Sequence, residues 1–423
     1  MGEGAQAPRQ RRGLRAAGPH HVADRRLTLK DFDEALALVL EGIEPLAPET
    51  VPLPRAEGRV IAEPARAAID LPPFDRTAMD GYAVRAADVA PGVALQVVGD
   101  LAAGGETLVI GPHTAARIST GAAIPEGADS ILKVEDTEGG DGVVTATASV
   151  REGLHIRRRG EDVHAGDVLA RPGDVLTVAR LSALASAGVA TVSVPRVPKV
   201  SLIVTGDELL PPGAPPEPGK IYESNSLVVA SLVRAVGAEV EQQPPVPDDF
   251  EATKAAIEHG LESDILIVSG GVSVGPHDHV KPAFEACGVD EVFWRVRIKP
   301  GKPLWFGRRG RTLVFGLPGN PLSAIVGTAM FVLPALRSLR GEPNVQPRLV
   351  KGRLGEPAGP SDNRTTFLIS KLVEDEDGTL VAWPTERQGS HMTGALGESD
   401  GFAIAPHGSG SLPAGAEVQL LRL

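Results

Sequence analysis

Residues 265–275 read ILIVSGGVSVG, an apolar run that passes directly into a loop with three glycines. A short, continuous apolar run is typical of a strand that is buried on both faces of a parallel sheet. Residues 200–206 read VSLIVTG and repeat this pattern of an apolar run followed by a glycine. The sequence therefore predicts buried parallel strands whose carboxyl ends carry glycine-containing loops.

Helix and strand patterns alternate outward from these two strands. Helices are expected at residues 226–236, 250–260, 280–287 and 321–339, and further strands at 238–242, 291–298 and 313–315. This alternation predicts a doubly wound, mostly parallel α/β domain over residues 196–341. Because ligands bind at the carboxyl ends of the strands in such sheets, we expect the loops at Gly206, Gly270 and Gly316 to meet at one rim.

The rest of the chain is divided by changes in pattern. Residues 1–26 carry six arginines but no apolar core, which predicts a flexible extension. Short β-rich runs between Gly and Pro breaks predict a β-rich module over 66–166 and a small β-barrel-like domain over 342–423. Residues 27–65 and 167–195 would form a linking domain of helix and β-structure, with one helix starting near Thr28, where Thr28 and Asp31 resemble a capping pair.

The bulk composition excludes several classes of protein. The formal net charge of −12 argues against nucleic acid as the main partner, since an acidic surface repels phosphate backbones. Cys287 is the single cysteine, so neither an intramolecular disulfide nor a cysteine zinc site is expected, which suits the cytosol. No stretch approaches the ~20 consecutive apolar residues of a membrane span. We therefore expect a cytoplasmic globular protein of several domains.

Two loops of the predicted α/β domain are suited to anions. In residues 269–275, glycines turn backbone N–H groups toward a ligand and serine hydroxyls add donors, although a plain structural turn is the alternative. This loop fits neither the Walker pattern nor the dinucleotide pattern. Residues 299–303, KPGKP, mount two lysines on a proline-stiffened loop that suits phosphate or another oxyanion; a solvated surface pair is the alternative.

A third loop, residues 316–323, opens the last predicted helix of this domain. Asn320 is expected to cap that helix and Pro321 fits its first turn. The free N–H groups of the first turn would form a further anion site.

Carboxylates follow one strand end and recur in the β-rich module. Residues 204–209, VTGDEL, place two carboxylates after a strand, where they would hold Mg²⁺ or act as acid or base; a turn cap is the alternative. Residues 71–84 and 119–129 combine carboxylates and hydroxyls without any core periodicity. Residues 156–162, IRRRGED, are either a solvated edge or a clamp for a phosphate held by a partner subunit.

Taken together, the seven stretches and their order along the chain resemble the molybdopterin molybdenumtransferase family, the type that includes the E domain of gephyrin, from about residue 28 to the C-terminus. The resemblance implies four domains, an elongated homodimer, and an α/β domain similar in fold to the molybdopterin adenylyltransferases. It further implies that molybdate and adenylylated molybdopterin are the substrates, that Mg²⁺ assists, and that AMP leaves as molybdenum reaches the dithiolene. Adenylyltransferase and molybdoenzyme partners are also implied.

The resemblance assigns roles to individual residues. The acidic and hydroxyl positions with catalytic roles fall on Asp80, Thr120, Asp162, Glu208, Asp248 and Asp278. Of these, Asp248 and Asp278 would hold the cation, and Asp80 and Thr120 would act across the dimer. The candidate binding residues are Thr205, Gly206, Ser269, Gly270, Gly271, Ser273, Gly275, Lys299, Lys302, Pro303, Pro318, Gly319, Asn320, Ser323 and Ser390.

One position departs from the family pattern. The family usually has an arginine facing molybdate shortly after an aromatic residue, whereas this chain has Ile369 there. Either Arg364 or Arg387 substitutes, or molybdate binding is weakened, or the chain is a paralogue with altered handling. Two other functions therefore stay open: a molybdopterin adenylyltransferase, and a non-catalytic protein that binds molybdopterin as a scaffold.

Overall fold

A computed structural model describes residues 29–140, 142–272, 278–361 and 363–423 of the chain. The chain divides into two compact units. The α/β–barrel unit consists of Met1–Leu46, Val197–Arg340 and Asn344–Leu423, and the β-rich unit consists of Ala47–Arg196 and Gly341–Pro343. The finer division into four domains stays a prediction.

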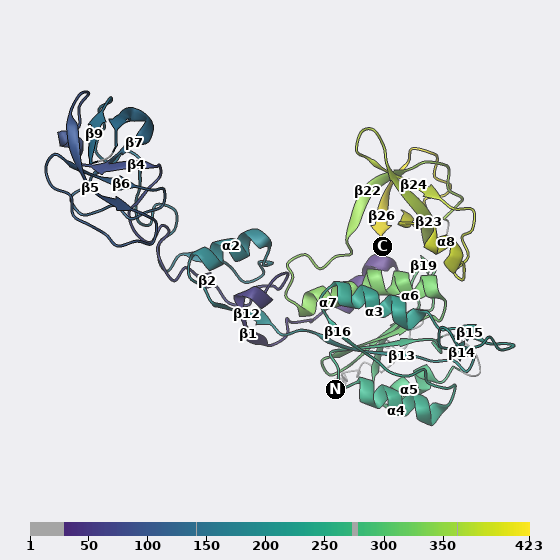
Figure 1. The fold of residues 1–423 in the computed structure, drawn as a ribbon. Helices are drawn as coiled ribbons and strands as arrows, with labels where there is room; N and C mark the ends of the chain where they lie inside the picture. Colours follow the sequence, from purple (N-terminus) through teal and green to yellow (C-terminus); the bar gives the residue numbers. More distant parts are fainter. Residues whose placement is uncertain (1–28, 141, 273–277, 362) are drawn as a thin grey trace, which may run out of the picture. The chain divides into compact units, whose positions relative to one another are not determined.

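The α/β–barrel unit is built on a six-stranded sheet with the strand order β16-β13-β17-β21-β20-β18 (Figure 1). In that order, the strands span Glu239–Gln242, Lys199–Val204, Ile265–Ser269, Thr312–Leu317, Trp305–Arg309 and Asp290–Trp294. The first four strands are parallel, and β20 and β18 complete the sheet in antiparallel pairings. The predicted mostly parallel sheet is confirmed.

Helices cover both faces of this sheet, as Figure 1 shows for α3, α6 and α7 on one side and α4 and α5 on the other. The helices on the first side, together with α1, span Phe32–Leu40, Asn225–Ala235, Pro321–Gly327 and Leu333–Leu339; those on the second side span Phe250–Gly260 and Val280–Ala286. Successive residues of β17 enter opposite cores, with Ile265 and Ile267 in one and Leu266 and Val268 in the other. This alternation is why the strand is apolar at every position.

The helical run over residues 321–339 is long and apolar enough to cross a membrane by length and composition alone. However, 94% of its apolar window is buried inside the protein, so it is the core helix of the α/β sheet. Cys287 lies in the core on the other face of the sheet, and burial raises the pKa of its thiol.

Two sequence predictions about this sheet were wrong. The strand expected at 291–298 is two strands, because the chain leaves β18 at Trp294, turns at Arg295 with φ 81°, and joins another sheet as β19 (Ile298–Lys299). Strand β20 was not predicted; it pairs with β21 through a turn at Gly310.

The predicted start of the first helix was also partly wrong. Helix α1 begins at Phe32, and Asp31 occupies the N-cap position without a side-chain capping bond. The Asp31 carboxylate instead pairs with Arg297 at 2.6 Å. The other proposed capping residue, Thr28, lies outside the described residues.

The C-terminal part closes into a five-stranded barrel, as the predicted β-barrel-like domain requires. The barrel order is β23-β24-β22-β26-β25, and β25 pairs back with β23. These strands span Thr365–Glu374, Leu380–Pro384, Leu349–Leu354, Glu417–Arg422 and Gly401–Ala405. Strand β19 extends β23 in parallel, and thus links the barrel to the lysine-bearing loop that follows β19.

The β-rich unit holds a six-stranded sheet in the order β7-β4-β6-β5-β9-β8. These strands span Ser130–Lys133, Gly81–Val84, Thr114–Ile118, Ala94–Leu101, Val143–Ala146 and Thr137–Gly139. Its remaining elements are the antiparallel pairs β1 (Pro48–Pro52) with β12 (Thr191–Pro195), β2 (Ala65–Arg66) with β11 (Val168–Ala170), β3 (Arg76–Thr77) with β10 (Ile156–Arg157), and helix α2 (Val178–Ser186).

Ile369 on β23 belongs to the apolar core that the barrel shares with the α/β sheet. Its exposed fraction is 0%, and Phe367, Phe402 and Leu322 lie in the same core. The position where the resemblance implies an arginine is therefore a packing position in this chain.

Replacement of Ile369 by arginine tests this placement. Burying an unpaired charge is expected to lower the free energy of unfolding by about 3 kcal/mol or more. The conservative control, Ile369→Val, should cost about 0.5–1.5 kcal/mol. Urea denaturation followed by circular dichroism measures both, and wild-type stability of Ile369→Arg would show that the position faces solvent.

Candidate functional site

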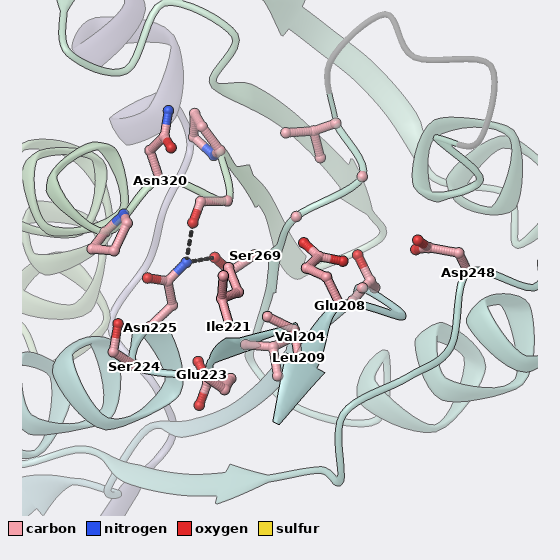
Figure 2. A pocket seen from close by; sticks show the side chains of 18 of the residues that line it. Val204, Glu208, Leu209, Ile221, Glu223, Ser224, Asn225, Asp248, Ser269 and Asn320 are labelled. Carbon is pink, nitrogen blue, oxygen red and sulfur yellow. Dashed lines mark hydrogen bonds between the residues drawn. The ribbon is translucent and has the colours of Figure 1, made fainter. Parts of the chain in front are cut away.

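A cavity of about 420 Å³ lies at the carboxyl ends of β13, β17 and β21 (Figure 2). Its walls include Thr205, Gly206, Glu208, Glu223, Asn225, Asp248, Ser269, Gly270, Gly271, Asp278, Pro303, Pro318, Gly319 and Asn320. Four of these are carboxylates, and no lysine or arginine is among the described lining residues. We call it the acidic cavity. The loops at Gly206 and Gly270 meet there as predicted, whereas Gly316 lies within β21 and the segment that follows this strand lines the cavity instead.

Two glycines allow the loops of the acidic cavity to pack closely. A Cβ at Gly206 would lie 2.5 Å from the Glu208 carboxylate, so the glycine lets this side chain fold over its own loop. Gly270 has φ +106°, and a Cβ there would lie 2.6 Å from the carbonyl oxygen of Thr205. The loops after β13 and β17 therefore touch through backbone, and any side chain at Gly270 would separate them.

Asn225, the first residue of helix α3, joins the end of β17 to the segment after β21, as Figure 2 shows. Its Nδ2 donates to Ser269 Oγ at 3.0 Å and to the Gly319 carbonyl at 2.7 Å. The side chain is 8% exposed, and the same wall contains two buried oxygens without a hydrogen-bond partner in the described chain, Asn225 Oδ1 and Thr205 Oγ1. Unsatisfied buried polar atoms are rare and concentrate at functional sites.

Sequence reasoning missed both Glu223 and Asn225. The polar run before helix α3 looks like an ordinary N-terminal cap, and Glu223 does serve locally: its Oε1 accepts the Ser226 N–H at 2.8 Å. The partners of Asn225 lie 44 and 94 residues away, so no local pattern could reveal its role.

The acidic cavity has the donors for a hard divalent cation. Asp248 and Asp278 line it with Glu208, and the Asp248 carboxylate and backbone N–H exchange bonds with those of Asp207 at 3.4 and 3.1 Å. No group of three or more metal-ligating side chains occurs in the part of the chain that the structure describes. The two carboxylates Asp248 and Asp278 fit Mg²⁺, which is commonly held by one or two carboxylates while water and ligand phosphates complete its shell.

A second cavity of about 460 Å³ adjoins the first and has the opposite charge. Its walls include Lys299, Gly301, Lys302, Pro303, Pro318, Asn320, Ser323, Arg364, Thr366, Phe367, Gln388, Gly389 and Ser390. No aspartate or glutamate is among its described lining residues. We call it the cationic cavity. Pro303, Pro318 and Asn320 line both cavities, which therefore share one wall.

Asn320 joins the α/β loop to the barrel at this shared wall. Its Nδ2 donates to Ser390 Oγ at 3.1 Å. The prediction that this side chain caps the last helix was wrong, although Asn320 does occupy the N-cap position and Pro321 the first helical one. The Asn320 side chain bonds to Ser390 on the barrel instead of to a backbone N–H of the helix.

Gln388 fixes the barrel loop that presents Ser390. Its Nε2 donates to the carbonyls of Ile369 at 3.0 Å and Thr385 at 2.6 Å, and its Oε1 accepts the Ile369 N–H at 2.9 Å. The side chain thus pairs with β23 as a neighbouring strand would. Among the two arginines considered as substitutes, Arg364 lines the cationic cavity, whereas Arg387 lies outside both cavities and pairs with Glu398 at 2.9 Å.

The two cavities account for most of the predicted site residues. Thr205, Gly206, Glu208, Asp248, Ser269, Gly270, Gly271, Asp278 and Gly319 line the acidic cavity; Lys299, Lys302, Ser323 and Ser390 line the cationic one; Pro303, Pro318 and Asn320 line both. Ser273 and Gly275 lie outside the described residues. The functional roles of all these residues stay predictions.

Of the three site residues predicted in the β-rich unit, Asp80 and Thr120 are in contact, and Asp162 is not bonded to either. Asp80 Oδ1 accepts from the Thr120 backbone N–H at 2.6 Å and from its hydroxyl at 2.8 Å. These donors, the backbone N–H first, lower the pKa of the Asp80 carboxyl. Asp162 is exposed, and no hydrogen bond or ion pair within the described residues joins it to this pair.

Two arginines of the 156–162 stretch are paired inside the same unit. Arg158 pairs with Asp75 at 2.6 Å and Arg159 with Asp70 at 2.5 Å. The Arg159 backbone N–H and the Arg158 side chain lower the pKa of Asp75. Of the two alternatives for this stretch, these ion pairs of exposed arginines favour a solvated edge over a clamp for a phosphate held by a partner subunit.

Comparison with known proteins covers both units. Family models match residues 30–188 ("MoeA N-terminal region (domain I and II)"), 201–338 ("Probable molybdopterin binding domain") and 351–423 ("MoeA C-terminal region (domain IV)"). Molybdopterin molybdenumtransferase 2 of Mycobacterium tuberculosis is 36% identical over 410 residues, 93% of this chain and 99% of the relative. Molybdopterin molybdenumtransferase of Haemophilus influenzae is 36% identical over 398 residues, 92% and 97% respectively.

Solved structures agree with these relatives. The molybdopterin biosynthesis moeA protein from Pyrococcus horikoshii OT3 superposes with a TM-score of 0.76 at 31% identity. The match covers 94% of this chain and 100% of that one.

The Asp80–Thr120 contact leads to a titration experiment. Thr120→Val removes the hydroxyl donor but keeps the backbone N–H, so the pKa of Asp80 should rise toward its ordinary value without reaching it. NMR titration of the Asp80 carboxyl carbon measures the change. Because the folded-state pKa is lowered, any stability from this contact is present above the ordinary pKa of aspartate and lost as the pH falls through the folded value.

Thr120→Ser is the matched control, since it keeps a hydroxyl and should preserve the lowered pKa. An unchanged pKa in Thr120→Val would show that the hydroxyl contributes nothing.

Proposed function

Since the chain belongs to the molybdopterin molybdenumtransferase family, we propose that it inserts molybdenum from molybdate into adenylylated molybdopterin and releases AMP. The protein is a transferase of molybdenum cofactor biosynthesis. The observation that carries the finer proposal is the pair of adjoining cavities with opposite charge. The proposed reaction joins two charged substrates. The pyrophosphate needs a cation, which the acidic cavity would hold, and the oxyanion needs the positive side chains of the cationic cavity.

The acidic cavity is the proposed site of the adenylylated pterin. Four carboxylates would repel the pyrophosphate by themselves, so this wall needs a bound cation. Asp248 and Asp278 would hold Mg²⁺, with Glu208 beside them. When bound, the ion supplies neutralisation of the pyrophosphate charge and polarisation of the P–O bond that breaks. The backbone of Gly270 and Gly271 and the Ser269 hydroxyl border the same space.

The cationic cavity is the proposed site of molybdate. Lys299 and Lys302 provide positive charge on a loop with proline at two positions, and Ser390 provides a hydroxyl. Because Ser390 Oγ already accepts from Asn320, its own O–H is directed elsewhere and can donate to an anion. Because the two cavities share Pro303, Pro318 and Asn320, the oxyanion would lie beside the pterin site.

The assembly and cellular setting are further parts of the proposal. A homodimer would let the β-rich unit of a second copy bring Asp80, Thr120 and Asp162 to the acidic cavity. Adenylyltransferases and molybdoenzymes would be transient partners, since one supplies the substrate and the other receives the product. A cytoplasmic location and the absence of nucleic-acid and membrane partners fit the single cysteine and the acidic net charge.

The structure favours insertion over the two other functions. An adenylyltransferase would need only the α/β sheet, yet the barrel contributes Arg364, Gln388 and Ser390 to the cationic cavity. The scaffold hypothesis depended on Ile369, and that side chain is buried in the core while an arginine still lines the cavity.

Molybdate-dependent release of AMP from adenylylated molybdopterin tests the proposal. Asp278→Asn and Lys302→Ala should each lower the rate by about 100-fold or more, because each removes a charge that faces a charged substrate group. EDTA should stop the release and added Mg²⁺ should restore it.

Arg387→Ala is the matched control, because its guanidinium pairs with Glu398 outside both cavities. Circular dichroism confirms that each variant is folded. Wild-type rates in both Asp278→Asn and Lys302→Ala would refute the proposal. A rate of AMP release that is the same with and without molybdate would also refute it.

A further inference from the structure

A third cavity, of about 370 Å³, lies on the C-terminal barrel. It is formed by strands β22, β23 and β24, which Figure 1 labels, and by the turns next to them. Its walls include Arg353, Gly355, Val373, Asp375, Val381 and Trp383. None of its described lining residues belongs to the acidic or the cationic cavity, so the proposed reaction does not use it. We call it the barrel cavity.

Trp383 gives the barrel cavity a large apolar surface that solvent reaches. The residue is 46% exposed, whereas Trp305 in the core of the α/β sheet is 2% exposed. A Cβ at Gly355 would lie 2.5 Å from the indole, so the glycine lets the ring lie directly against the backbone. Val373 on the neighbouring strand is also 46% exposed. A fixed, half-exposed tryptophan in a hollow is typical of a contact site, because tryptophan often anchors protein interfaces.

The turn that borders this cavity is held in one shape. Residues 374–377 read EDED and connect β23 to β24. The Asp375 carboxylate pairs with Arg353, and its Oδ1 accepts the N–H groups of Asp377 and Thr379, both at 3.0 Å. Asp375 is therefore occupied within the protein, and its bonds fix the positions of its neighbours.

The neighbours of Asp375 give the rim a negative charge. Glu374, Glu376 and Asp377 are exposed, and none of the three makes an ion pair within the ranges that the structure describes. Lys371 is in register with Trp383 and adds one exposed positive charge beside them. An acidic rim around an exposed indole suits a partner with several positive charges, since carboxylates attract it and the indole face binds a guanidinium.

This chain contains a segment with the complementary charge. The net charge of the whole chain is −12, yet the residues before Leu29 carry two acids and six arginines, namely Arg9, Arg11, Arg12, Arg15, Arg25 and Arg26. Residues 11–15 read RRGLR, which places three arginines beside one leucine. A guanidinium can stack on an indole while Leu14 offers an apolar side chain to Val373.

The segment is also long enough to reach the barrel cavity. The described chain starts beside the barrel, because the Lys30 N–H donates to the Arg295 carbonyl at 3.1 Å and the Lys30 carbonyl accepts the Arg297 N–H at 2.7 Å. The next strand, β19, pairs with the start of β23, and the cavity lies at the other end of β23. That strand has 10 residues and is about 30 Å long. Residues 16–28 can span up to about 40 Å.

We propose that the arginine-rich segment at residues 11–15 docks in the barrel cavity of its own chain, with a guanidinium on the Trp383 indole and the other charges against the acidic turn. The inference does not rest on the proposed function. Each contact at such an exposed site is weak, but the covalent link gives the segment an effective concentration on the order of mM, so a weak contact suffices.

The experiment uses fluorine NMR of the full chain labelled with 5-fluorotryptophan, with the Trp383 resonance assigned from Trp383→Phe. The combined replacements Arg11→Glu, Arg12→Glu and Arg15→Glu should shift this resonance and leave that of the buried Trp305 in place. Salt at 1 M, where charges are screened beyond about 3 Å, should shift the wild-type resonance in the same direction. In the triple variant, salt should have no such effect.

A charge swap makes the result specific to this pair of surfaces. Replacement of Glu374, Glu376 and Asp377 by arginine should also abolish the salt-dependent shift of Trp383, and combining it with the triple variant should restore the shift. The matched control reverses two arginines outside residues 11–15, Arg25→Glu with Arg26→Glu, and should behave as the wild type does. Thermal unfolding of each variant separates loss of docking from loss of fold.

Three outcomes would overturn the inference. The first is a wild-type Trp383 resonance in the folded triple variant, and the second is a charge swap that fails to restore the salt-dependent shift. The third is a shift that grows with protein concentration, because the segment would then bind a second copy of the chain instead of its own barrel.

Discussion

When β13, β17 and β21 pair in parallel, their carboxyl ends must lie at the same edge of the sheet. The acidic cavity depends on this constraint, and the cationic cavity adjoins it through the segment after β21. The segments that leave these strands carry Glu208, the Gly270–Gly271 pair and the Pro318–Asn320 segment, and all of them line the acidic cavity. The Asn225 amide then joins the loops after β17 and β21 to helix α3. The pairing of the strands therefore sets the position of the site, whatever side chains the loops carry.

The loops at this edge of the sheet separate negative from positive side chains. Carboxylates face one cavity and ammonium and guanidinium groups face the other, although the cavities share Pro303, Pro318 and Asn320. Neutral residues form the wall that the two oppositely charged cavities share. This arrangement suits the proposed reaction, which joins two charged substrates.

Much of the framework was predictable from local pattern. Apolar runs located β13 and β17, helical periodicity gave the bounds of α4, and the glycine-rich strand ends predicted a common rim. The errors have a common physical cause. Asn320, Asn225 and residues 291–298 are each decided by partners far away in the sequence, namely Ser390, Ser269 with Gly319, and two different sheets. Local propensity assigns a cap or a strand to such residues, and tertiary contacts override it. The burial of Ile369 belongs to the same class, since the core that holds it is shared by two parts of the chain.

The passage of the chain from β18 to β19 has a mechanical consequence. Within a few residues, the backbone leaves the α/β sheet at Trp294 and enters the barrel sheet at Ile298, and the lysine loop follows at once. The loop is thus anchored to both bodies, and any rocking of the barrel would change the spacing between Lys302 on one side and Ser390 on the other. The affinity for an oxyanion would then depend on how closely the barrel packs against the α/β sheet.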